Sequence, residues 1–82
     1  SAAQGVSWCS TAADAYDLQK KNLEVARRVL QNYRNKYDQG ALSSLDLTQA
    51  NTNYLSAESA YASASLDLLS AQVKLLKLYN ML

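Results

Sequence analysis

The sequence predicts an all-α fold, an antiparallel two-helix coiled-coil hairpin with helices at about 12–38 and 44–80. Proline is absent and the only glycines are Gly5 and Gly40, so both stretches lack a strong helix breaker. Small or apolar residues recur in both stretches at heptad spacing, which is typical of a coiled-coil seam. Signals that end one helix and start the next lie around Gly40.

Length limits the chain to one domain. Its 82 residues bury too small a share of their surface to be comfortably stable without a partner. We assign the hairpin to residues 11–82, with a turn at 39–43, and treat residues 1–10 as an N-terminal segment. The small-residue start Ser1-Ala2-Ala3, without an initiator methionine, favours an appended remnant or a piece of a longer protein. Residues 1–10 could also extend the first helix, and the sequence does not decide this.

The first helix has a start signal, a seam and a stop signal. Thr11 with Asp14 can form a capping box, and Gly40 can take the left-handed conformation that ends a helix. Gln19 is the one polar interruption of the seam. The predicted seam residues are Ala12, Tyr16, Gln19, Leu23, Ala26, Leu30, Tyr33 and Tyr37.

The second helix is better marked at its start. Ser43 can cap its free amides, Asp46 can return a hydrogen bond and meet the positive helix end, and Leu42 can pack on Leu47. The seam then continues for about five heptads. Its predicted residues are Leu47, Ala50, Tyr54, Ala57, Tyr61, Ala64, Leu68, Ala71, Leu75, Leu78 and Leu82.

A second apolar stripe predicts that the hairpin is an assembly unit. Two helices pack along one seam, so a further stripe should recruit more helices, and we expect self-association into a helical bundle. At 1.5 Å per residue the helices would be roughly 40 and 55 Å long, and the overhang of the second would also need a partner. The stripe residues are Leu18, Val25 and Val29 in the first helix and Leu55, Ala62, Leu66, Leu69, Val73 and Leu76 in the second.

Composition argues against several function classes. The chain has no histidine and one cysteine, Cys9, so a metal site, an internal disulfide, a cofactor and an activated nucleophile are all unexpected, and we predict no enzyme activity. The net charge is +1, which favours neither nucleic acid nor a charged membrane surface. The pairs Lys20-Lys21 and Arg27-Arg28 are interpreted as a solvated helix face with local ion pairs. No stretch is apolar for long enough to span a bilayer as a helix.

The sequence around the turn resembles that of TolC-like outer-membrane factors, the outer membrane efflux proteins. In that family a helix ends in Tyr-x-x-Gly, and after a short turn the next helix opens with a hydrophobic residue, Asp and another hydrophobic residue. Here Tyr37 precedes Gly40 by three residues, and Leu45-Asp46-Leu47 follows. The flanks, Asn22 to Arg28 before the turn and the alanine-rich heptads up to Tyr79 after it, are also similar, so the resemblance covers roughly residues 15–82.

The resemblance implies a periplasmic hairpin of a homotrimeric export duct in a Gram-negative outer membrane. Such a duct carries drugs, other small molecules or secreted polypeptides, and works with a periplasmic adaptor protein and an inner-membrane pump. By position, the turn residues Gly40, Ala41, Leu42 and Ser43 would dock on the adaptor. Tyr37 and Asp46 match tip residues whose polar contacts close the duct aperture.

Three positions depart from the family pattern. Ala41 separates the turn glycine from the leucine that directly follows it in some members, Leu42 stands where an arginine occurs, and Gln49 replaces a second acidic residue. These departures favour adaptor docking over gating by charge. The alternative function is a generic self-associating coiled-coil or four-helix-bundle interaction domain, in which the turn only reverses the chain.

Overall fold

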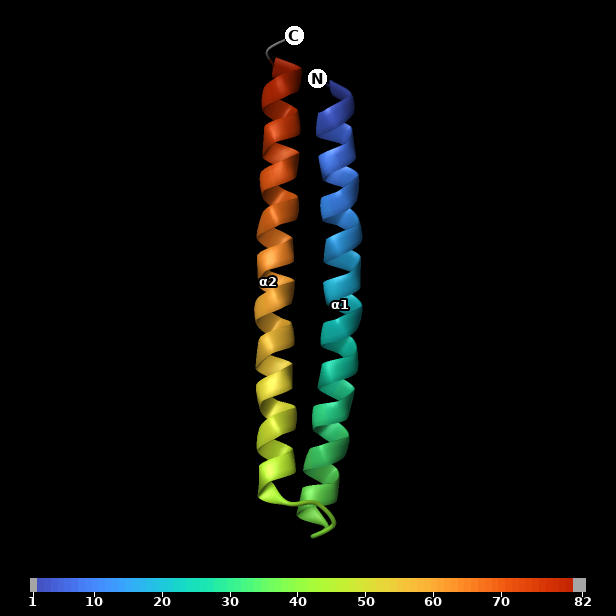
Figure 1. Ribbon diagram of the computed structural model, residues 1–82, viewed down its shortest axis with the longest axis vertical. Helices are drawn as coiled ribbons and strands as arrows, with labels where there is room; N and C mark the ends of the chain where they lie inside the picture. The colour runs from blue at the N-terminus through green and yellow to red at the C-terminus, as the bar shows by residue number, and fades with distance from the viewer. Residues whose placement is uncertain (1, 81–82) are drawn as a thin grey trace.

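The chain forms two antiparallel helices of equal length, α1 (Ala2–Asp38) and α2 (Ser44–Asn80), each of 37 residues (Figure 1). This computed structural model describes the backbone of residues 2–80 and the side chains of residues 9–80. No strand occurs in the described backbone. The predicted all-α hairpin is therefore confirmed, and the turn falls at residues 39–43 as expected.

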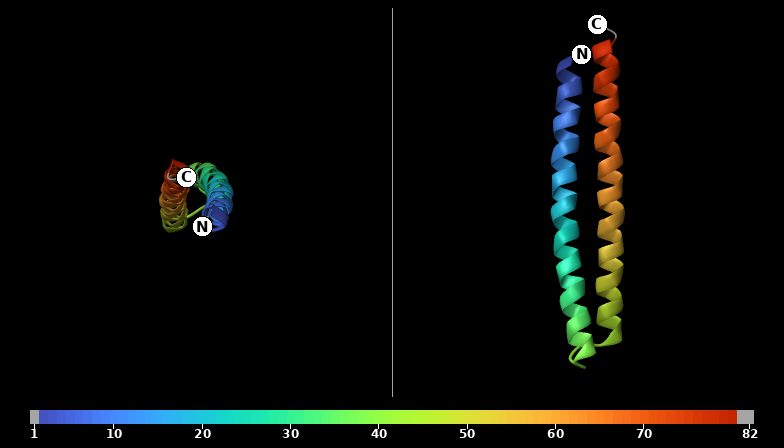
Figure 2. Two further views of the ribbon diagram at one scale, coloured as in Figure 1. Left: turned by 90° about the horizontal axis from the view of Figure 1, so that it is seen from above. Right: turned by 180° about the vertical axis from the view of Figure 1, so that it is seen from behind.

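The molecule is a rod only two helices wide. Its principal extents are 63 × 13 × 12 Å, and its radius of gyration is 18.3 Å, compared with about 12 Å for a compact chain of this length. The helices lie side by side along their whole length in the front and back views (Figures 1 and 2). A rod of this shape has a seam between the helices but no third element to enclose it.

The start of α1 corrects the predicted bounds. The helix begins at Ala2 rather than near residue 12, so residues 2–11 are helical and α2 has no overhang. Thr11 lies inside the helix, and the capping box predicted from Thr11 and Asp14 does not mark its start. Gly5 costs about 1 kcal/mol as an interior helical glycine, and α1 nonetheless includes it. Cys9, which is partly buried, lies one heptad before Tyr16 and continues the seam.

The predicted seam is confirmed by burial. The buried residues of the described side chains are Leu23, Leu30, Ala50 and Ala64, and all four are seam positions. The other described seam positions are partly buried, except Tyr37 and Leu78, which are exposed near the helix ends. Leu82, the last predicted seam residue, lies outside the described residues. Small side chains at Ala50 and Ala64 let the helices approach, and larger residues fill the space between them.

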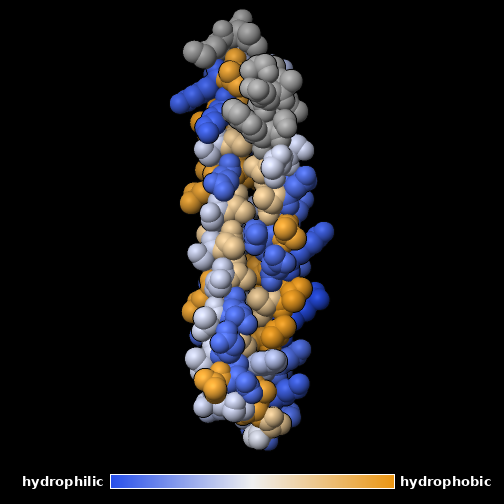
Figure 3. Space-filling view, in the orientation of Figure 1, coloured by the Kyte–Doolittle hydropathy of each residue, from blue (hydrophilic) through white to orange (hydrophobic). Residues whose placement is uncertain are grey.

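Every residue of the second apolar stripe is exposed. Its leucines and valines on both helices retain between 39% and 67% of their accessible surface, and apolar surface recurs along the outer edges of both helices on the face seen in Figure 3. The accessible surface of the chain is 6163 Å², compared with about 4,900 Å² for a globular monomer of this mass. The fold thus leaves apolar surface that a single hairpin cannot cover.

Candidate docking site at the turn

The end of α1 is fixed by a glycine in the left-handed conformation. Gly40 has φ 76°, and its amide donates to the Tyr37 carbonyl at 2.9 Å. The Ala41 amide donates to the Lys36 carbonyl at 2.8 Å. These two bonds form the Schellman motif, which satisfies the last carbonyls of a helix. The turn therefore has a defined backbone, which gives the end of the rod a fixed shape.

The start of α2 has one of the two hydrogen bonds of the predicted capping box. The Asp46 amide donates to Ser43 Oγ at 3.2 Å, and the Leu47 amide donates to the Ser43 carbonyl at 3.2 Å, which confirms Ser43 as the N-cap. Among the described residues, the Ser43 amide donates no hydrogen bond to the Asp46 carboxylate, so the predicted capping box is only half formed. Asp46 lies in the first turn, where its charge still meets the positive helix end.

The other residues predicted at the tip differ in exposure. Gly40, Ala41, Ser43 and Asp46 are exposed, whereas Leu42 is partly buried. A Cβ at Gly40 would meet no atom within 4 Å, so the surface around the turn is open. The position of Leu42 is compatible with the predicted packing on Leu47, which is also partly buried, and less compatible with free access to a partner.

Leu45 is a tip residue that the seam pattern did not single out. It lies in the first turn of α2 and is 77% exposed, the highest value among the large apolar side chains that the structure describes as exposed. An apolar side chain this exposed gains free energy when a partner covers it, by roughly 25 cal/mol per Å². The available signal was its position: Leu45 precedes the first seam residue, Leu47, by two residues and so cannot face α1.

A shallow groove lies between the helices close to the turn. It has a volume of about 280 Å³ and is lined by Leu30 and Arg34 of α1 and by Leu47, Thr48 and Asn51 of α2. The Thr48 hydroxyl donates to the Ser44 carbonyl at 2.8 Å, so its hydrogen-bonding capacity is partly used within the helix. The groove combines apolar side chains with one cation, which suits a side chain of another protein better than an enclosed small molecule.

The two predicted aperture residues do not contact each other within this chain. Tyr37 is 43% exposed at the end of α1, Asp46 is exposed at the start of α2, and no hydrogen bond joins them among the described residues. The net charge around the turn is small, because Lys36 carries one positive charge and Asp38 and Asp46 together carry two negative charges. Neither side chain is therefore a hydrogen-bonding partner of the other within this hairpin.

A tyrosine pair joins the helices far from the turn. The hydroxyl groups of Tyr16 and Tyr61 are 2.9 Å apart and hydrogen-bonded, and the ring centroids are 5.3 Å apart with a 40° tilt. The hydrogen bond to Tyr61 and the Coulombic effect of Tyr61 raise the pKa of Tyr16 above its usual value of 10.0. Two seam tyrosines thus form a polar contact where most other seam positions are apolar.

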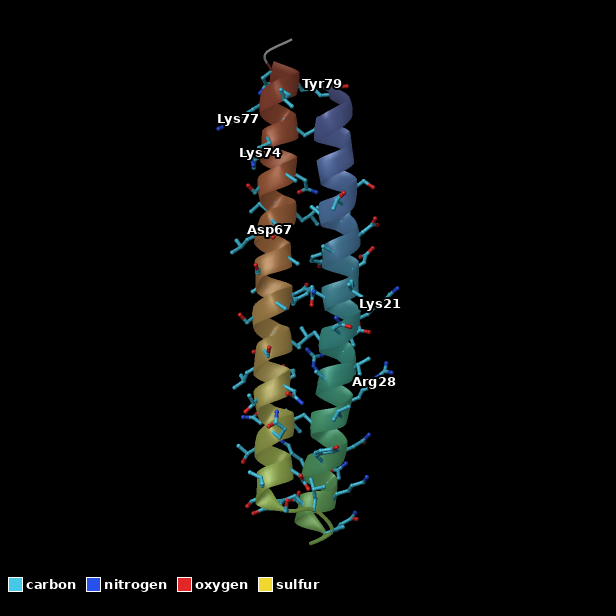
Figure 4. All side chains as sticks on the ribbon, in the orientation of Figure 1. Lys21, Arg28, Asp67, Lys74, Lys77 and Tyr79 are labelled. Carbon is cyan, nitrogen blue, oxygen red and sulfur yellow. The ribbon has the colours of Figure 1, made fainter. Side chains whose placement is uncertain are left out.

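The charged residues along the helices do not form a second candidate site. Lys20, Lys21, Arg27 and Arg28 are exposed, and Figure 4 shows Lys21 and Arg28 pointing away from α2. Within the described part of the chain, no three His, Cys, Asp or Glu side chains gather where they could hold a metal ion. Neither helix, over the same residues, has an apolar stretch long enough to cross a membrane.

Comparison with known proteins agrees with the features of the turn. The sequence model of the family described as outer membrane efflux protein matches residues 2–81, nearly the whole chain. A search of curated proteins and a search of solved structures gave no match. The matched range includes the whole of α1 and α2 and the turn between them. The chain therefore belongs to the outer membrane efflux protein family.

Proposed function

We propose that this hairpin is the periplasmic tip of a TolC-like efflux or secretion channel and that its turn docks on a periplasmic adaptor protein. Through that adaptor the parent channel, a homotrimer, works with an inner-membrane pump. The family match supports the channel, and the exposed turn supports the docking site. The observation that carries the docking proposal is Leu45, an apolar side chain left 77% exposed beside a turn of defined shape.

The chemistry of the turn favours contact through shape and apolar surface. The charges of Lys36, Asp38 and Asp46 nearly cancel, so long-range attraction contributes little. Exposed Leu45, with the open backbone at Gly40 and Ala41, offers a partner helix a small apolar contact and free access to the backbone. Covering this side chain would contribute roughly 25 cal/mol for each Å² of apolar surface removed from water.

The test uses binding of the chain to the helical hairpin of a cognate adaptor, with Leu45→Asp as the main variant and Leu66→Asp as the matched control. Leu66 is 67% exposed and lies about 30 Å along α2 from Leu45. We expect Leu45→Asp to weaken adaptor binding by about tenfold or more, because a carboxylate replaces the apolar anchor. Gly40→Val should also weaken binding, because a β-branched residue resists a positive φ and distorts the turn.

The two leucine positions separate docking from self-association. Leu66→Asp should reduce association between copies of the chain, and it lowers adaptor binding only if the adaptor requires the assembled form. Leu45→Asp should reduce adaptor binding without changing association between copies. Unchanged adaptor binding by both Leu45→Asp and Gly40→Val would contradict docking at the turn.

We further propose that the exposed stripe is covered by neighbouring hairpins in the wall of the export duct, and by other copies of the chain when it is isolated. The supporting observations are the exposed leucines and valines on both helices and a surface that exceeds that of a globular monomer by roughly 1,300 Å². This excess is larger than the area that one partner contributes to a typical stable interface, about 800 Å². Sedimentation over a concentration series tests it, and a chain that remains monomeric at the highest concentrations would contradict it.

A further inference from the structure

Tyr16 and Tyr61 form the single ring-to-ring contact among the described residues. Tyr16 comes from α1 and Tyr61 from α2, and both side chains are partly buried in the seam. The hydroxyl oxygens are 2.9 Å apart, and the ring centroids are 5.3 Å apart. The contact therefore places two phenols from opposite helices together, with their hydroxyl groups hydrogen-bonded and their rings tilted by 40°.

This arrangement is suited to oxidative coupling. A phenol that loses an electron and a proton becomes a radical whose unpaired electron lies partly on the ring carbons next to the hydroxyl. Because the two hydroxyls are within hydrogen-bonding distance and the ring centroids are 5.3 Å apart, the ring carbons next to the hydroxyls lie near each other in the seam. We propose that Tyr16 and Tyr61 are an oxidative cross-linking site, at which hydrogen peroxide, acting through a haem peroxidase, joins the two rings as dityrosine.

The reaction balances without any group from the protein other than the two phenols. Each phenol loses one electron and one proton, and a carbon–carbon bond forms between the two ring positions. Each of these carbons then loses its hydrogen as a proton while the adjacent oxygen regains one, which restores both aromatic rings. The net loss is two electrons and two protons. Hydrogen peroxide takes up both pairs and becomes two molecules of water, with a haem peroxidase passing the electrons one at a time.

The cross-link would give this chain a covalent connection that it otherwise lacks. Its one cysteine, Cys9, cannot form an internal disulfide. Tyr33, Tyr37, Tyr54 and Tyr79 have no ring partner within the described chain, so intramolecular coupling is expected only between Tyr16 and Tyr61. A bond between these two rings would prevent α1 and α2 from separating.

The experiment treats the dilute chain with a haem peroxidase and limiting hydrogen peroxide. Intact mass separates products within one chain from products between chains, and peptide mapping locates the bond. We expect a monomer that has lost two hydrogen atoms, shows dityrosine fluorescence and carries the bond between Tyr16 and Tyr61. Tyr54→Phe is the matched control, because Tyr54 is also a partly buried seam tyrosine but has no ring partner.

Two variants make the outcome decisive. Tyr16→Phe and Tyr61→Phe keep the ring and remove the hydroxyl, so the helices should persist by circular dichroism while the intramolecular product is lost. The Tyr54→Phe chain should keep that product at the wild-type yield. The proposal is overturned if the wild-type chain gives only products between chains, or if Tyr16→Phe leaves the intramolecular yield unchanged.

Discussion

The turn residues each have a separate physical role. Gly40 supplies the positive φ that ends α1, and Ser43 accepts the hydrogen bond that starts α2. Both roles could be predicted because they depend on local chemistry. The return bond from Asp46 could not, because water competes for an exposed carboxylate. Leu45 was part of the family signature but was not predicted to contact a partner, because a seam pattern describes only the residues that face the other helix.

Gly40→Ala should lower the free energy of unfolding by about 1 kcal/mol. The cause is backbone conformation alone, because an added Cβ would meet no atom within 4 Å. Gly40→Asn should cost less, because asparagine tolerates the left-handed region better than alanine. Urea unfolding of the three chains measures this difference, and equal losses for alanine and asparagine would show that backbone conformation is not the cause.

Ser43→Ala should cost about 1 kcal/mol, because it leaves the Asp46 amide without its acceptor. Asp46→Asn should cost only about 0.3 kcal/mol, since it removes a helix-dipole interaction and no capping bond. Thermal or urea unfolding distinguishes the two substitutions, with Ser44→Ala as the control at the next residue. A loss at Asp46 as large as that at Ser43 would indicate that the full capping box forms in solution.

The Tyr16 hydroxyl should make stability fall at alkaline pH. The unfolded chain releases this proton at the usual pKa of 10.0, whereas the folded chain holds it to a higher pH. The folded state therefore binds more protons above pH 10.0, and the free energy of unfolding falls there, whereas the contribution is complete below that pH. Urea unfolding over an alkaline pH series should show a shallower decline for Tyr16→Phe than for the wild type. Tyr79→Phe, at a residue 75% exposed, should leave the decline unchanged.

At the scale of the helices, heptad spacing predicted most of the structure. A seam position must face the other helix, so burial of Leu23, Leu30, Ala50 and Ala64 followed from spacing alone. The start of α1 was harder, because Thr11 and Asp14 have the spacing of a capping box and Gly5 is a poor helix former. Despite both local signals, α1 is helical from Ala2. Cys9, one heptad before Tyr16, was the available indication that the seam continues.

Leu30→Ala should lower the free energy of unfolding by about 2 kcal/mol or more, because it removes a seam side chain and leaves a cavity. Leu30 is 4% exposed, and Leu66 is 67% exposed. The same substitution at Leu66 should change the stability of a dilute sample by no more than about 0.5 kcal/mol. Similar losses at both positions, measured by urea unfolding, would mean that the exposed stripe is already covered under those conditions.

At the scale of the whole molecule, the hairpin leaves an apolar stripe exposed. The sequence indicated this through two stripes on helices that can pack along only one seam, and the exposed leucines and valines agree. Heptad spacing predicts that a helix packs against another helix, but it does not identify that helix. The partner of the exposed stripe therefore could not be predicted from spacing. The turn was more informative than the stripe. Its sequence motif resembles one family closely enough to identify it, and the family match agrees.

Stability of the isolated chain should therefore depend on its concentration. If copies cover each other's stripes, the associated form is favoured as concentration rises, and Tm rises with it. Calorimetry or circular dichroism over a hundredfold concentration range measures the effect, and Leu66→Asp combined with Leu76→Asp should remove most of it. A Tm independent of concentration in the wild-type chain would show that one hairpin is stable by itself.

The equal lengths of α1 and α2 limit which insertions can lengthen the hairpin. The described helices begin and end side by side at the end opposite the turn (Figure 1). An insertion in one helix alone would shift its seam residues out of register with those of the other. Paired insertions of seven residues, one in each helix, would keep both seams aligned and move the turn outward by about 10.5 Å. Paired insertions of this kind would therefore change the distance between the turn and the opposite end of the hairpin in fixed steps of about 10.5 Å.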